Sequence, residues 1–128
     1  MSRLIASRGL ILEALEAAGI PAATGGRFSA PCVLVEPGDP WADVERLQGR
    51  GSRLGRWQLT AIAGRSDTDA AFTELADLVD RVDAAVLTVA GLQLPTWARP
   101  TDRQLGGASY GATVATVQLM TPKEEAAR

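Results

Sequence analysis

Residues 67–87 form the stretch that decides the fold, and they read DTDAAFTELADLVDRVDAAVL. Apolar side chains recur there at steps of three and four, at Phe72, Leu75, Val79, Val82 and Val86. This spacing predicts one apolar stripe on an α-helix about 30 Å long. Alanine and leucine widen the stripe, at Ala71, Leu78 and Ala85. Acidic residues occupy the opposite side, so the helix must pack its stripe against another apolar layer.

The segments around this helix predict four strands, which cover residues 31–36, 56–63, 92–97 and 112–120. We expect Pro37–Pro40 to end the first of them, because this run has strong turn chemistry. Residues 41–47 fit either a helical turn or an irregular strand. The third strand must lie at an edge or a bulge, because Pro95 cannot donate to a ladder. We expect residues 101–111 to form a loop.

A first helix is predicted for residues 4–18, with Ser2 as its cap and Gly19 as its stop. The order of elements predicts an α+β two-layer sandwich, in which both helices pack on one face of a mainly antiparallel or mixed sheet of about four strands. Residues 1–120 are expected to form a single domain, and residues 121–128 a flexible C-terminal tail.

Composition excludes several classes of protein. The 128 residues are 46% hydrophobic and carry a net charge of −2, which argues against general nucleic-acid binding. The single cysteine, Cys32, allows no intrachain disulfide, and we expect it to be a buried thiol. No apolar run is long enough to cross a membrane. Glu13 and Glu16 follow the N-terminus closely, so we expect no signal peptide and synthesis in a reducing cytoplasm.

Residues for catalysis or metal binding are scarce. The chain has no histidine, which removes the commonest general base and metal ligand. The acids of the long helix do not converge, and a solvated face explains them better than a metal site does. Residues 106–111 resemble a phosphate-binding loop, but they lack its lysine and precede a strand, so a glycine-rich turn is expected. We therefore predict no catalytic, cofactor or metal site, and no enzyme.

One segment, residues 45–56, points to an interface. Its arginines alternate with glycines, and guanidinium groups bind carboxylates and phosphates through paired hydrogen bonds. A solvated loop, a contact with an acidic protein and a contact with passing DNA all remain open. The candidate interface residues combine these arginines with acids of the long helix: Arg46, Arg50, Arg53, Arg56, Asp77, Asp80 and Asp83. Trp41 and Trp97 are either core residues or interface anchors.

Several stretches together carry a resemblance over nearly the full chain. They read GLILEAL from Gly9, PCVLVEP from Pro31, RWQLTAIAGR from Arg56, DAAFTEL from Asp69 and YGATV from Tyr110. This pattern resembles the tail terminator proteins of long-tailed phages, especially those that infect actinobacteria and have a lambda-like tail terminator fold.

The resemblance implies a structural virion protein rather than an enzyme, with no cofactor. Six copies would close into a homo-hexamer ring that caps the tail tube, ends its polymerisation and offers a docking surface to the head. Its partners would be the major tail tube protein and a head-completion or neck protein. DNA would pass through the lumen without sequence-specific binding. Such a ring would lie at the head-proximal end of the tail, after assembly in the host cytoplasm. The alternatives are a head-tail connector or head-closure neck protein, and a small binding domain unrelated to phages.

Overall fold

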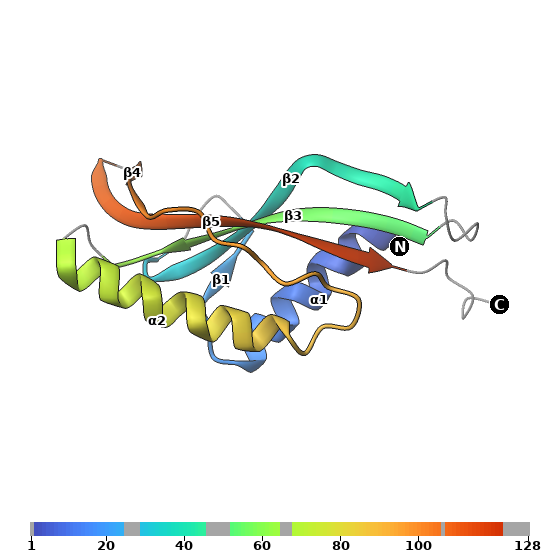
Figure 1. Ribbon diagram of the computed structural model, residues 1–128, viewed down its shortest axis with the longest axis horizontal. Coiled ribbons are helices and arrows are strands. Elements are labelled where there is room, and N and C mark those ends of the chain that lie inside the picture. The colour runs from blue at the N-terminus through green and yellow to red at the C-terminus, as the bar shows by residue number, and fades with distance from the viewer. Residues whose placement is uncertain (1, 25–28, 46–51, 65–67, 106, 122–128) are drawn as a thin grey trace.

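The computed structural model describes residues 2–24, 29–45, 52–64, 68–105 and 107–121. Two helices and five strands follow one another along the chain: α1 (Arg3–Ala17), β1 (Ala22–Ala23), β2 (Cys32–Glu45), β3 (Ser52–Ile62), α2 (Thr68–Val86), β4 (Thr101–Leu105) and β5 (Ala108–Thr121). Figure 1 shows the long strands β2, β3 and β5 running side by side above the two helices. β5 reaches Thr121, the first residue of the expected tail, and residues 122–128 lie outside the described part.

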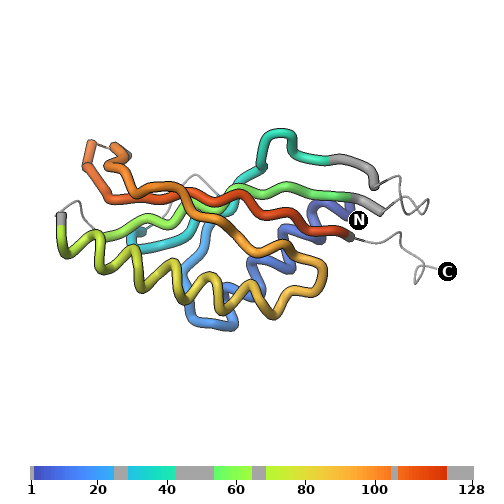
Figure 2. Tube along the Cα trace, viewed as in Figure 1, coloured from blue at the N-terminus to red at the C-terminus, as the bar shows by residue number. Residues whose placement is uncertain are grey.

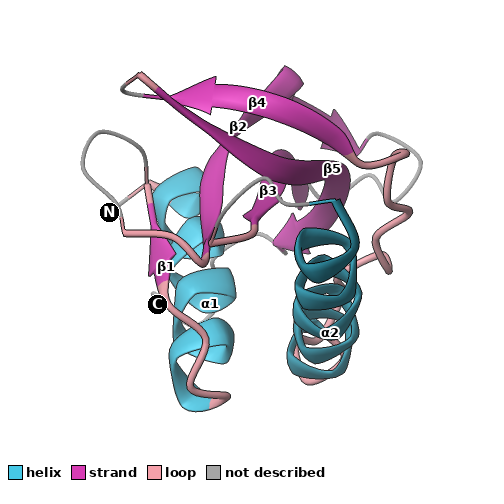
Figure 3. Ribbon diagram, turned by 90° about the vertical axis from the view of Figure 1, so that its left-hand side faces the viewer, coloured by secondary structure: helices cyan, strands magenta, loops and turns pink. Residues whose placement is uncertain are grey.

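The five strands form one mixed sheet in the order β1-β2-β3-β5-β4. β1 pairs with β2 in parallel, and the other neighbours are antiparallel. Both helices cover the same face of the sheet (Figure 3). The predicted α+β arrangement is thus confirmed, with five strands where about four were expected.

The long helix buries its predicted stripe, with one exception. Leu75, Leu78, Val82 and Val86 are each at most 5% exposed and belong to the main core. Phe72, in contrast, is 61% exposed, so its assignment to the buried stripe is wrong. Gly111 of β5 explains this, because a Cβ there would stand 3.3 Å from the Cβ of Ala71. The close approach turns Ala71 towards the sheet, and Phe72, one residue further round the helix, moves to the rim.

The first helix is held at its start by local hydrogen bonds and by a buried contact. The Ser2 hydroxyl accepts from the backbone nitrogens of Leu4 and Ile5, which confirms the predicted cap. Further along, the buried Ser7 hydroxyl accepts from Trp57 Nε1 at 2.9 Å and donates to the Leu4 carbonyl at 2.7 Å. Since Trp57 lies on β3 and is fully buried, this pair fixes α1 over the middle of the sheet.

The prediction that Pro37–Pro40 ends the first strand is wrong. β2 pairs with β3 up to Pro37 opposite Trp57, shifts register, and resumes at Ala42 opposite Gly55. The prolines are tolerated because β1 covers only Val33 and Leu34, which leaves this part of β2 at the edge of the sheet. Gly38 lies against β3, where an added Cβ would stand 2.9 Å from the Arg56 carbonyl oxygen. Of the two alternatives for residues 41–47, residues 41–45 form the irregular strand.

The edge strand beside β5 also differs from the prediction. Residues 92–97 follow β5 through isolated bridges at Leu92 and Trp97, but they form no regular strand. Pro95 lies between these bridges and cannot donate to a ladder. The regular edge strand is instead β4, within the segment that was expected to be a loop. Of the glycine-rich turn predicted for residues 106–111, Gly107 does occupy the turn between β4 and β5, but residues 108–111 belong to β5.

The other face of the sheet carries a second, smaller cluster of buried residues. It consists of Cys32, Leu34, Ile62 and Ala112. Cys32 is 2% exposed, so the prediction of a buried thiol is confirmed. Burial raises the pKa of this thiol above its usual value, because a thiolate is poorly solvated there.

Candidate functional site

The acidic residues of α2 occupy two different environments. Asp77 and Asp80 are exposed on the helix surface. Asp83 is half-buried, and its Oδ1 atom accepts a hydrogen bond of 2.9 Å from Trp97 Nε1. This bond ties the segment between α2 and β4 to the helix. Of the three candidate acids, Asp77 and Asp80 are therefore more accessible to a partner than Asp83.

The candidate arginines are spread over the β2–β3 hairpin. Arg46 and Arg50 lie outside the described residues. Arg53 occupies a position in β3 opposite Val44 of β2. Arg56 is half-buried on β3, and its Nη1 atom is buried without a hydrogen-bond partner in the described part of the chain. Because Arg56 alternates with Trp57, it lies on the sheet face that the helices leave uncovered.

The hairpin lies at one end of the sheet. Its last described pair joins Glu45 to Ser52, and residues 46–51 connect the two strands. Figure 1 shows this end of β2 and β3 beside the N-terminus of α1. Figure 2 shows how α1 runs away from there towards its C-terminal end. Within one copy, Arg56 lies on one face of the sheet, and Asp77, Asp80 and Asp83 of α2 lie on the other side. The structure therefore does not bring Arg56 and these acids together.

A groove separates the C-terminal halves of the two helices, which lie side by side in Figure 3. We call it the interhelix groove; one part of it, of about 360 Å³, is lined by Ala14, Ala17, Ala18, Arg81, Ala84, Ala85 and Thr88. A second part continues past Ala14 and Thr88 to Leu10, Glu13, Val89 and Ala90. Leu10 on α1 and Leu87, directly after α2, are 45% and 65% exposed.

One carboxylate and one guanidinium group line this groove. Glu13 lines it, and Asp77 and Asp80 stand one helical turn before its lining residues Arg81 and Ala84. Arg81 is the cation of the lining, and its Nη2 atom donates to the Gly19 carbonyl at 3.2 Å across the helix pair. The groove thus combines apolar walls with one acidic and one basic side chain, Glu13 and Arg81. Sequence reasoning missed it, although alanines concentrate at the C-terminal ends of both predicted helices.

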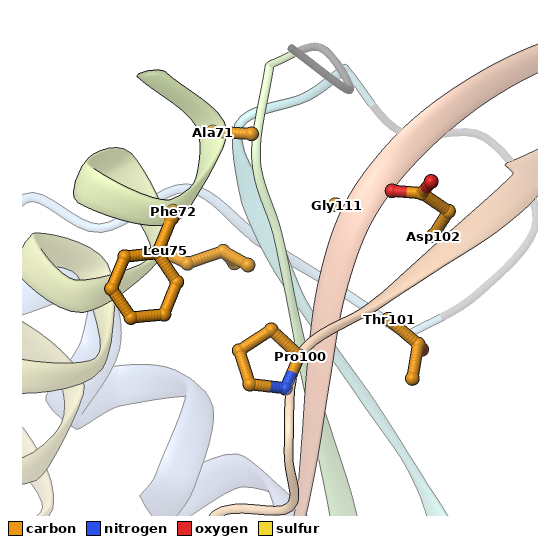
Figure 4. A pocket seen from close by; sticks show the side chains of 7 residues that line it. All are labelled: Ala71, Phe72, Leu75, Pro100, Thr101, Asp102 and Gly111. Carbon is orange, nitrogen blue, oxygen red and sulfur yellow. The ribbon is translucent and has the colours of Figure 1, made fainter. Parts of the chain in front are cut away.

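A smaller notch of about 240 Å³ lies where α2 begins beside β4. Ala71, Leu75, Pro100 and the exposed ring of Phe72 form its apolar side (Figure 4). Thr101 and Asp102 contribute the polar side.

Trp41 and Trp97, which the sequence left as either core residues or interface anchors, both pack against core residues. Trp41 packs edge-on against Trp57, with ring centroids 5.8 Å apart, and is 40% exposed. Trp97 is half-buried, packs against the main core and donates to Asp83. Each therefore has a packing role and an accessible part.

Within the described ranges, no group of three or more Cys, Asp or Glu side chains is placed to hold a metal ion. Neither α1 nor α2 is long and apolar enough to pass through a membrane, judged over the same residues. The accessible chemistry of this part of the chain consists of charged and apolar surfaces. No known protein family matches the chain, and no curated protein matches it either.

Proposed function

We propose that this chain is a tail terminator of a long-tailed phage, a structural protein that forms a ring on the end of the tail tube. It acts by shape, copy number and surface charge, without a cofactor. Its partners in this proposal are further copies of itself, the major tail tube protein and a head-completion or neck protein. The ring lies at the head-proximal end of the tail, and DNA passes through its lumen.

One observation carries the proposal beyond the resemblance in sequence. The arginine-rich β2–β3 hairpin lies at the end of the sheet where α1 begins, and the acidic surface of α2 lies on the helix layer. The two surfaces thus belong to different parts of the molecule. Two different surfaces of opposite charge favour a heterologous contact, in which each copy uses one surface on each neighbour. Such contacts close into a ring when the rotation between copies is suitable.

The test is a capping assay with the major tail tube protein of a long-tailed phage. We expect the purified chain to stop tube growth, so that electron microscopy shows short tubes with one ring at one end. Reversing two arginines of the hairpin, Arg50→Glu with Arg53→Glu, should abolish ring closure or capping while circular dichroism still shows the folded monomer. The matched control, Arg99→Glu with Arg103→Glu, changes the charge by the same amount near β4 and should cap normally.

Tubes of unlimited length in the presence of the unmodified chain would contradict the proposal. Binding to the head vertex without any effect on tubes would assign the chain to the neck instead.

A further inference from the structure

We propose that residues 91–98 form an edge strap, which keeps β5 from pairing with the same strand of a second copy. The hydrogen bond from Trp97 to Asp83 is the latch that holds this strap in place. The inference goes beyond the proposed function, because it concerns the free chain and holds whatever assembly the chain enters. It assigns a role to a segment between α2 and β4 that follows β5 through two isolated bridges.

The feature that the strap shields is the uncharged second part of β5. Residues 112–121 read ATVATVQLMT and contain no charged residue, no proline and no glycine. Such a stretch favours an extended backbone and pairs readily with an identical stretch, because no charge repels a second copy. β3 pairs with residues 112–121 on one side, whereas β4 pairs with residues 108–112 on the other. Without a cover, residues 113–121 would present an open edge to another chain.

The edge strap lies along this open side. In Figure 1 the segment runs from the end of α2 along β5 to β4. Backbone groups that a further strand would use are already paired with the strap. The N–H groups of Gln93 and Ala98 donate to the carbonyls of Gln118 and Val114, each at 2.8 Å, and the Met120 N–H donates to the Gly91 carbonyl at 3.3 Å.

Side-chain hydrogen bonds fasten the C-terminal end of the strap. Trp97 is half-buried against the main core, and its Nε1 atom donates to Asp83 Oδ1 of α2 at 2.9 Å. The Thr113 hydroxyl donates to the Ala98 carbonyl from β5 itself. A hydrogen bond to a carboxylate is stronger than one between neutral groups, so the Trp97–Asp83 bond is the main latch.

The two long edges of the sheet are protected in different ways. β2 carries Pro37 and Pro40 and a shift of register, which make it a poor template for another strand. The uncharged part of β5 has no such feature in its own sequence, and the strap supplies the protection instead. Pro95 lies within the strap and has no N–H, so the strap does not become a new pairing edge itself.

Hydrogen exchange tests the latch. Trp97→Phe keeps an aromatic ring but removes the N–H that Asp83 accepts, and Thr113→Val removes the second side-chain bond by an independent change. We expect the backbone amides of Gln93 and Ala98 to exchange roughly tenfold faster or more in each variant. The matched control is Trp41→Phe on β2, across the sheet from the strap, which should leave both amides unchanged.

Cysteine cross-linking tests what the strap excludes. Thr116→Cys, at an exposed position of β5, is placed in a Cys32→Ala background with or without Trp97→Phe or Thr113→Val, and a short bismaleimide is added. We expect cross-linked pairs of two copies to increase at least about fivefold when the strap is loosened. The same experiment with Gln104→Cys, an exposed position on β4, should show no increase.

Unchanged exchange of Gln93 and Ala98 in both loosened variants would overturn the latch. Faster exchange without more cross-linking at position 116 would overturn the role of the strap as an edge cover. An equal increase at positions 116 and 104 would indicate general aggregation and would also overturn it. Capping of tubes by the unmodified chain tests the proposed function separately, since it leaves the strap intact.

Discussion

The two faces of the sheet differ in how completely they are covered. On the inner face, two helices bury Trp57, Leu59 and Val117 completely, and the indole N–H of Trp57 is paired with Ser7. On the outer face, the cluster around Cys32 is small, and two buried polar atoms, Thr60 Oγ1 and Arg56 Nη1, have no partner in the described part of the chain. The comparison indicates that the inner face supplies most of the folding stability. Among the described residues, the outer face buries fewer apolar side chains and leaves buried polar atoms without partners.

The largest effect is expected for Trp57→Ala on the inner face. This change removes the largest fully buried side chain of the described core and leaves a cavity under α1. We expect the free energy of unfolding to fall by about 3–5 kcal/mol. Chemical denaturation followed by circular dichroism measures it. The control Leu87→Ala, at a position 65% exposed, should change stability by less than about 0.5 kcal/mol. A loss of similar size in both variants would refute the comparison.

A sharper test replaces one buried hydroxyl on each face. Ser7→Ala leaves the Trp57 N–H buried without its acceptor and should lower stability by about 1–3 kcal/mol. Thr60→Val removes a buried hydroxyl that has no partner and should be neutral, or stabilise by up to about 1 kcal/mol. Denaturation midpoints of the two variants, each compared with the unmodified protein, measure this difference in stability between the two faces. A Thr60→Val loss as large as that of Ser7→Ala would show that the outer face is as well satisfied as the inner one.

The smallest effect concerns pH and Cys32 on the outer face. The pKa of the buried thiol is raised in the folded chain, so the unfolded chain loses this proton first as pH rises. Its contribution to stability is therefore fully present below the unfolded pKa and is lost as pH rises through the folded pKa. We expect unmodified protein to lose stability between about pH 8 and pH 10 more steeply than Cys32→Ala does. Parallel slopes in denaturation experiments would contradict this expectation.

Sequence reasoning located the elements whose signals are local. The period of α2, the Ser2 cap and the alternation of β3 each depend on residues a few positions apart. Sequence reasoning failed where contacts with residues distant in the chain decide the local structure. Phe72 fits the apolar stripe by spacing, but Gly111, far along the chain, sets how α2 rotates against β5. Among the candidate interface residues, Asp83 could not be separated from Asp77 and Asp80 by pattern, because its partner Trp97 comes from a distant segment.

By itself, the amino-acid sequence determined the α+β class, the positions of both helices, the burial of Cys32 and the lack of histidine chemistry. These follow from periodicity, capping and composition, which need no knowledge of distant contacts. Only the tertiary structure decided that β2 continues through Pro37–Pro40, that β4 forms the edge, and that the two helices enclose a groove with alanine-rich walls. The physical reason is that a strand's edge status and a groove's walls depend on which neighbours pack beside them.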